Sequence, residues 1–140
     1  VWIDMKLNYD ELNDKMKKLV NAAIDAKKNS YAPISGFKVG AAILADTGEI
    51  FSGVNVEITS FSPTICAERN AIFSMFTTGE RNYSAIAVCG SSPDTFPCGV
   101  CRQVIYETSP ECEVLIVNSL SDIESYRIQD LLPHGFRLEE

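Results

Sequence analysis

The chain has 140 residues, a net charge of −7 and a pI of about 4.7. This length is typical of one domain, residues 1–140, which can bury a core without disulfide bonds. The acidic charge and the lack of a Lys/Arg stripe argue against a nucleic-acid polymer or an anionic membrane as partner. No segment resembles a signal peptide and no apolar run approaches the ~20 residues of a membrane span, so we expect a cytoplasmic protein.

The first predicted element is an amphipathic helix over about Tyr9 to Lys28. Its apolar residues recur at spacings of three, four and seven, as Leu12, Met16, Leu19, Val20, Ala23 and Ile24. The lysines between them are then expected on the solvated face of the helix. Residues 1–4 precede Met5, and the sequence leaves open whether they are native, were added in cloning or are disordered.

A loop, a hairpin and a second helix follow. The loop YAPISGF, residues 31–37, contains Pro and Gly. The segments KVGAAILA (38–45) and EIFSGVNV (49–56), joined by DTG, predict two strands and a turn. The segment CAERNAIFSMFTTG begins after Pro63 and ends at Gly79, which predicts a helix.

The second half alternates apolar strands with helices. SAIAVCG (84–90) and EVLIVN (113–118) are continuous apolar runs, typical of strands covered on both faces. CGVCRQVIYE (98–107) predicts a helix, and SYRIQDLLP (125–133) predicts a short strand or edge followed by a helical turn. The order predicts an α/β fold with three layers, α/β/α. Its mixed sheet has about five strands with an N-terminal hairpin, parallel where a helix forms the crossover.

Three of the five cysteines are spaced for a metal site. A disulfide framework is not expected in a chain of this size without a secretory signal. Cys98 and Cys101 form a C-x2-C pair, a spacing found in zinc sites and in redox dithiols. Cys66 and this pair both open predicted helices, whose N–H groups and dipoles stabilise thiolates. Two helix N-termini can therefore supply three sulfurs to one tetrahedral Zn²⁺.

The other candidates for a fourth ligand, Cys89, Cys112 and His134, belong to no motif. Cys89 lies in an apolar strand, Cys112 precedes one, and His134 stands in the turn-like segment LLPHGF. Three protein ligands are typical of catalytic zinc, which keeps a position for water. Glu68 supplies the base that such a site needs, provided that Cys66 lies at the helix entry.

Arg69 and Arg102 directly follow the two cysteine groups. Three thiolates give a zinc ion an excess of negative charge, which reduces the acidity of a coordinated water. We expect at least one of these arginines to donate hydrogen bonds to the ligand sulfurs and to withdraw charge from them.

The C-A-E and P-C-x-x-C motifs resemble the signature of the zinc deaminases, in which a non-ligating Glu accompanies the ligands. Because the first ligand here is Cys66, the chain is similar to the three-cysteine branch. The resemblance runs from about Tyr31 to Phe136 through GFKVGAAIL, GVNVE, TICAERNAI, PCGVCRQV and LLPHGF. Together these segments resemble the small cytidine deaminases, the homotetrameric class of the cytidine/deoxycytidylate deaminase superfamily.

The resemblance implies a role for each matching residue. The three cysteines would hold one Zn²⁺ per chain, and the glutamate of the C-A-E motif would shuttle protons. Asn55 and Glu57 would bind a sugar hydroxyl, and their equal parity on a strand places them on one side. Phe37 would lie against the base, and the Ala67 backbone N–H would hold the base carbonyl. Phe136 would complete the pocket of a neighbouring subunit.

The chain departs from the family pattern at a few positions. Relatives commonly read VENASY where this chain has VEITSF, with Ile58 and Phe61. Phe61 lacks the phenol hydroxyl that could reach the far end of the sugar. Phe96 stands where serine is usual, although the role there uses the backbone carbonyl, and Ile34 replaces a frequent aromatic. These changes keep the chemistry and leave the exact nucleoside, ribose or deoxyribose included, undecided.

The resemblance implies hydrolytic deamination of cytidine and 2′-deoxycytidine to uridine and 2′-deoxyuridine with release of ammonia, in pyrimidine salvage. A blasticidin-S-type deaminase is the near alternative, and Glu57 favours an ordinary nucleoside. A structural zinc module without turnover is the alternative of another class; it needs a fourth ligand and leaves Glu68 without a role. A redox dithiol would leave Cys66 idle, and the acidic charge disfavours polynucleotide editing.

Overall fold

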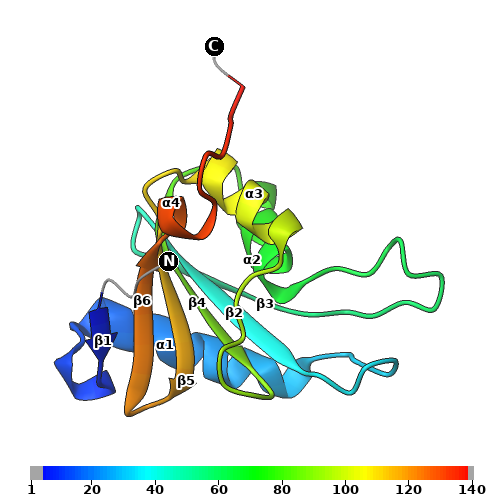
Figure 1. Cartoon of the computed structure of the whole chain (residues 1–140), viewed down its shortest axis with the longest axis horizontal. Helices are drawn as coiled ribbons and strands as arrows, with labels where there is room; N and C mark the ends of the chain where they lie inside the picture. Colours follow the sequence, from blue (N-terminus) through cyan, green and yellow to red (C-terminus); the bar gives the residue numbers. More distant parts are fainter. Residues whose placement is uncertain (1–4, 139–140) are drawn as a thin grey trace.

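Helices cover both faces of one six-stranded sheet (Figure 1). The computed structural model describes residues 5–138, so residues 1–4, whose origin the sequence left open, lie outside the described residues. The elements in chain order are β1 (Met5–Leu7), the 3-10 helix η1 (Tyr9–Glu11), α1 (Asp14–Ala26), the 3-10 helix η2 (Lys27–Asn29), β2 (Val39–Ala45), β3 (Ile50–Val54), α2 (Ala67–Thr77), β4 (Tyr83–Gly90), α3 (Gly99–Thr108), β5 (Glu113–Ser119), β6 (Asp122–Arg127) and α4 (Ile128–Leu131). Within residues 5–138, no helix has the length and apolar character that crossing a bilayer requires.

The strand order in the sheet is β1-β6-β5-β4-β2-β3. The β4–β5 pair is parallel because α3 forms the crossover between them, and the other neighbouring pairs are antiparallel. This confirms the predicted mixed α/β sheet and its β2–β3 hairpin. The sheet has one strand more than the expected five, because β1 pairs with β6 from Met5 opposite Ser125. A three-residue strand carries too little periodicity to be recognised from sequence.

Two cores lie on opposite faces of the sheet. On β4, Ala85, Ala87 and Cys89 pack with α1, whereas Ile86 and Val88 pack with α2 and α3. This alternation follows from the period of two along a strand, and it explains why β4 reads as a continuous apolar run. Cys89 therefore lies on the side of the sheet that faces α1.

The predicted helix from Tyr9 to Lys28 consists of three pieces, η1, α1 and η2. Leu12 and Asn13 are extended, and the Asn13 side chain caps α1 by accepting the Met16 N–H at 2.9 Å. Capping by Asn satisfies a helix N–H that has no partner inside the helix, so the regular helix begins after Asn13.

Helix α2 packs directly on β3 at Gly53. A Cβ at this position would lie 2.4 Å from the Ala71 nitrogen and 2.6 Å from the Ala67 oxygen, so only glycine fits without movement. Because α2 begins next to Cys66, this contact fixes how far the first turn of α2 stands from the sheet.

We expect Gly53→Ala to lower the free energy of unfolding by about 1–3 kcal/mol, because α2 must move away from β3 to admit the methyl group. Urea denaturation followed by circular dichroism measures the change. Gly99→Ala is the matched control, since a Cβ there has no atom within 4 Å. Equal stability of the Gly53→Ala and Gly99→Ala proteins would contradict this account of the α2–β3 contact.

Candidate metal and active site

Three cysteine sulfurs meet where α2 and α3 begin. Cys66 is the N-cap of α2, Cys98 is the N-cap of α3, and Cys101 lies in the first turn of α3. The Sγ atoms of Cys66 and Cys98 are 3.7 Å apart, and all three sulfurs lie within 4.8 Å of one another. Two thiolates bound tetrahedrally to zinc at ~2.3 Å would be about 3.8 Å apart. The donor set and its spacing therefore fit Zn²⁺.

The two remaining cysteines, Cys89 and Cys112, lie in the hydrophobic cores and not at the cluster. Cys89 is buried against α1, and Cys112 is fully buried in the core on the α2 and α3 side, where its thiol donates to the Glu113 carbonyl at 3.5 Å. Burial raises the pKa of both thiols, which disfavours the thiolate form that metals bind. Within the described residues the metal-binding group consists of the three clustered cysteines, and neither His134 nor these two thiols belongs to it.

The electrostatics of the cluster favour thiolate at Cys66. The hydrogen bond from Cys101 and then the one from Arg69, whose Nη2 donates to the Cys66 Sγ at 3.3 Å, lower the pKa of Cys66 to about 5. The shared proton stays on Cys101, whose pKa is raised first by its hydrogen bond to Cys66 and then by burial. A bound metal would displace this proton, so we expect metal binding to release it.

Of the two candidate arginines, Arg69 contacts a sulfur. Arg102 donates instead to two backbone carbonyls, those of Pro97 at 2.7 Å and Leu131 at 2.9 Å. Arg102 therefore links Pro97, the residue before Cys98, to the end of α4. Arg69 is the arginine placed to withdraw charge from the thiolates.

Glu68 lies beside the sulfurs in the first turn of α2 and is 4% exposed. Its side chain and that of Cys66 line one cavity because Cys66 is extended, at φ −77° and ψ 155°, rather than helical. Burial raises the pKa of Glu68 to about 7, against a smaller lowering by a backbone hydrogen bond. A carboxyl group with such a pKa can both accept and return a proton near neutral pH.

The cavity in front of the cluster has a volume of about 230 Å³. It brings together most of the residues expected at the site: Phe37, Asn55, Glu57, Cys66, Ala67, Glu68 and Cys98. Sequence reasoning missed four further lining residues as site residues: Val39, Thr64, Ile65 and Thr95. These residue types indicate no catalytic or metal-binding role. Only their position in or next to the recognised motifs could have indicated that they line the site.

Asn55 and Glu57 have a second task in this cavity. The Asn55 amide accepts the Val39 N–H at 3.0 Å and donates to the Phe37 carbonyl at 2.8 Å. The Glu57 carboxylate accepts both the N–H and the hydroxyl of Ser35. These bonds fix the loop before β2, whose Phe37 lines the cavity, and sequence reasoning did not anticipate this supporting role.

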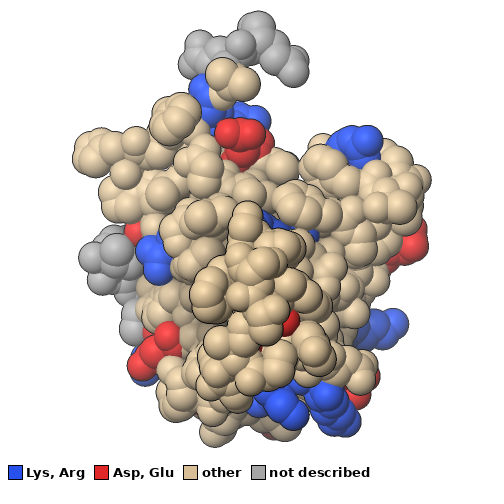
Figure 2. Space-filling model, turned by 90° about the vertical axis from the view of Figure 1, so that its right-hand side faces the viewer, with Lys and Arg blue, Asp and Glu red and all other residues tan. Residues whose placement is uncertain are grey.

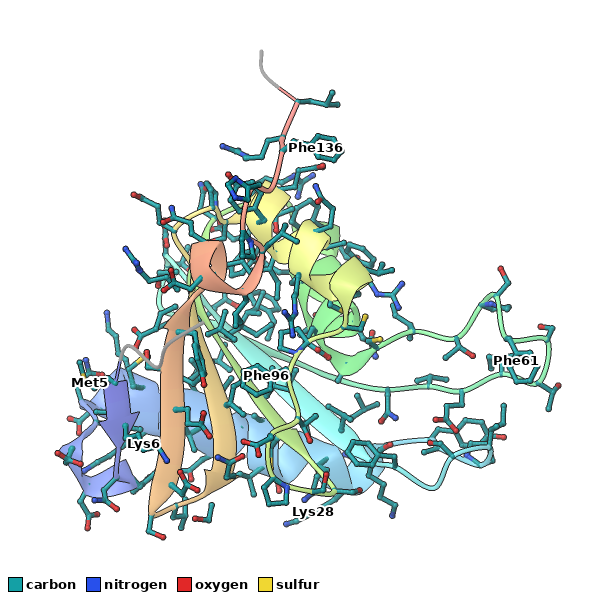
Figure 3. The ribbon with its side chains drawn as sticks, viewed as in Figure 1. Met5, Lys6, Lys28, Phe61, Phe96 and Phe136 are labelled. Carbon is teal, nitrogen blue, oxygen red and sulfur yellow. The ribbon has the colours of Figure 1, made fainter. Side chains whose placement is uncertain are left out.

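Two aromatic residues lie away from this chain's own cavity. Phe136 is 73% exposed on the C-terminal segment, which projects beyond α3 (Figure 3), and its carbonyl accepts from the Gln103 amide at 3.1 Å. Phe61 is at the tip of the long β3–α2 loop (Figure 3), 69% exposed and at φ +64°. Neither ring lines the cavity.

Comparisons with known proteins identify the family of this chain. The sequence model of the family described as cytidine and deoxycytidylate deaminase zinc-binding region matches residues 13–117. A cytidine deaminase of Halalkalibacterium halodurans is 40% identical over 124 residues, which are 87% of this chain and 94% of that protein. The crystal structure of cytidine deaminase from Burkholderia pseudomallei has a TM-score of 0.81 and 42% identity, covering 89% of this chain and 100% of that one. That of cytidine deaminase from Mycobacterium tuberculosis has a TM-score of 0.75 and 34% identity, covering 90% and 100%.

Three clustered thiols beside a buried carboxyl, carried by an α/β/α sandwich, are the arrangement expected of a zinc-dependent hydrolase. The chain belongs to the cytidine and deoxycytidylate deaminase family.

Proposed function

We propose that this chain is a zinc-dependent cytidine deaminase that converts cytidine and 2′-deoxycytidine to uridine and 2′-deoxyuridine in pyrimidine salvage. The observation that carries the proposal is the burial of Glu68 in the same cavity as the Cys66 and Cys98 sulfurs. The similarity to proteins named cytidine deaminase along most of the chain supports it.

The reaction needs a nucleophile and a group that moves protons. Zn²⁺, when bound by the three cysteines, would supply Lewis acidity that lowers the pKa of a water and so makes it a nucleophile near neutral pH. Glu68 accepts a proton from the attacking water and delivers it to the ring nitrogen next to the reacting carbon. It then takes the proton of the newly added hydroxyl group and passes it to the exocyclic amine, so that the carbon–nitrogen bond breaks, ammonia leaves and the carbonyl forms. Water is consumed, and the exocyclic amine is replaced by a carbonyl oxygen.

The walls of the cavity suggest how the nucleoside lies. Ala67 at the start of α2 and Phe37 both line the cavity, where the Ala67 N–H would hold the base carbonyl and Phe37 would lie against the base. Asn55 and Glu57 present polar groups to the cavity, where they would bind a sugar hydroxyl. Glu57 in the cavity favours an ordinary nucleoside over a blasticidin-S-type substrate. Burial of Glu68 beside the sulfurs favours turnover over a structural zinc module.

The test is ammonia release from a panel of cytidine, 2′-deoxycytidine and blasticidin S, with zinc measured on the same sample. We expect about one zinc per chain and release from both cytidine nucleosides. Release from blasticidin S alone would support the near alternative. Zinc without release from any member of the panel would support the structural module.

We further propose that the protein is a homotetramer with shared active sites. The cavity of one chain, at about 230 Å³, is smaller than the ~300–1,000 Å³ usual for ligand pockets, so a second chain would supply missing walls. The face on the side of the two long loops, the one before β2 and the one between β3 and α2, is largely free of charge at its centre (Figure 2). These loops carry the exposed side chains of Tyr31, Ile34 and Phe61. Exposed apolar groups gathered on one face are typical of a protein–protein interface.

In this assembly Phe136 would enter a neighbour's pocket. We expect Phe136→Ala to raise the KM for cytidine about tenfold, the scale of losing one buried interface aromatic, without loss of zinc. Co-expression with Glu68→Gln should restore activity, because mixed assemblies pair an intact Glu68 with a neighbour's Phe136. Leu120→Ala, which removes an exposed apolar side chain in the β5–β6 turn, is the control. A fully active monomer by light scattering would contradict the shared site.

We place this activity in the cytoplasm. All five cysteines are free in the structure, and a three-thiolate site needs Cys66, Cys98 and Cys101 to be reduced.

A further inference from the structure

A buried glutamate outside the proposed chemistry lies on β6. Glu124 is 6% exposed, and its carboxylate accepts hydrogen bonds from the Tyr126 hydroxyl at 2.6 Å and the Asn118 amide at 2.8 Å. These bonds, that of Tyr126 first, lower the pKa of Glu124 and keep it ionised at neutral pH. Lys6 of β1 (labelled in Figure 3) is its register partner and adds a favourable positive charge.

Both partners of this carboxylate contact the loop of residues 91–97, which joins β4 to α3. The Asn118 Oδ1 accepts the Asp94 N–H at 2.7 Å. The Tyr126 ring meets the Phe96 ring edge to face, with centroids 5.3 Å apart and an interplanar angle of 64°. The Phe96 ring lies over the sheet below α3 (Figure 3). One carboxylate therefore orients two side chains that hold the loop at two points.

The loop needs such support because its backbone is unusual. Asp94 has φ +60°, a left-handed conformation that costs energy for a residue other than glycine and persists only when its surroundings hold it. Thr95 folds back over Gly90, where a Cβ would lie 2.1 Å from the Thr95 Oγ1. The hydrogen bond from the Asp94 N–H to the Asn118 side chain helps to hold Asp94 in this conformation.

We propose that Glu124 is a positioning residue, which sets the cavity wall formed by Thr95 and Phe96 and thereby the discrimination between bases. The inference rests on the proposed function. Thr95 and Phe96 line the cavity, and only Pro97 separates them from the ligand-bearing turn at Cys98. Because the reacting carbon must lie beside the metal ligands, a wall next to Cys98 contacts the base rather than the sugar. A residue on β6, outside all of the recognised motifs, thus influences which base the cavity accepts.

Three variants distinguish the positioning of the loop by Glu124 from a general destabilisation of β6. Glu124→Gln keeps the volume and can still accept from Asn118, but its amide nitrogen cannot accept the Tyr126 hydroxyl. Tyr126→Phe removes the hydroxyl and keeps the ring against Phe96. Ser125→Ala is the matched control, because Ser125 is equally buried on β6 but points to the opposite face, where it donates to Glu113.

Two readouts are made on the zinc-loaded proteins. Hydrogen exchange of the loop amides, Asp94 above all, should quicken about tenfold or more in Glu124→Gln and Tyr126→Phe, the scale of one charge-assisted hydrogen bond. The ratio of kcat/KM for cytidine to that for 5-methylcytidine should change by about tenfold, as expected for a displaced wall. The ratio for cytidine to 2′-deoxycytidine and the zinc content should stay at the wild-type values, and the double variant should add little to either single one.

Unchanged loop exchange and unchanged base discrimination in both variants would overturn the proposal, as would equal effects of Ser125→Ala. If Glu124→Gln fails to fold, Tyr126→Phe decides by the same criteria. If the wild-type protein releases no ammonia, the proposed function fails, and the exchange experiment still decides whether Glu124 holds the loop.

Discussion

Glu68→Gln is expected to reduce kcat for cytidine by at least about 10²–10⁴-fold, the usual contribution of general acid–base catalysis. The effect should reach or exceed the upper end, because the same carboxylate serves each proton transfer. The amide keeps the shape of a side chain that is almost fully buried, so zinc content should remain at the wild-type level. Steady-state ammonia release and metal analysis on one preparation measure both quantities.

The control is Glu49→Gln, which makes the same substitution in the exposed turn of the β2–β3 hairpin. Its activity should equal that of the wild-type protein. A Glu68→Gln protein with a near-normal kcat would remove the proton shuttle from the mechanism. Loss of zinc from that protein would instead make Glu68 a part of the metal site.

Cys98→Ala is expected to abolish zinc retention and, with it, deamination. Removing a partner one shell outside the ligands already lowers metal affinity about 10–100-fold, so loss of a ligand should cost more. Cys98 is exposed and caps α3 only weakly, through the Cys101 N–H at 3.4 Å, so the fold should tolerate the change. Metal analysis after dialysis against a weak chelator measures retention, and circular dichroism checks the fold.

Cys89→Ala provides the comparison, because this thiol lies in the core against α1 and not in the cluster. It should keep about one zinc per chain. Full zinc occupancy in Cys98→Ala would exclude Cys98 as a ligand. Loss of zinc from Cys89→Ala would show that the metal lies elsewhere.

The approach of the two cysteine groups could be predicted because each opens a helix. The apolar segments predicted the layered sheet, and the rule that a helical crossover joins parallel strands predicted the β4–β5 pair. The extended conformation at Cys66 was needed for Glu68 to face the sulfurs, and the structure places Cys66 at the helix cap. Local patterns were sufficient here because the relevant groups are close to helix ends.

The parts that sequence did not predict depend on contacts between distant segments. Strand β1 is ordered by pairing with β6, and its three residues have no pattern of their own. The bonds of Glu124 join neighbours on β5 and β6 to the loop after β4, and no motif indicates this arrangement. The loop-holding bonds of Asn55 and Glu57 likewise appear only when the segment before β2 lies beside the end of β3.

The central claim is that zinc held by Cys66, Cys98 and Cys101 enables Glu68 to carry out cytidine deamination. Its most direct test is to strip the metal, add zinc back stepwise and measure ammonia release from cytidine at each step. The account predicts no activity without metal, a rise in proportion to bound zinc, and saturation at about one zinc per chain. Full activity of the metal-free protein, or a fully zinc-loaded protein that releases no ammonia, would contradict it.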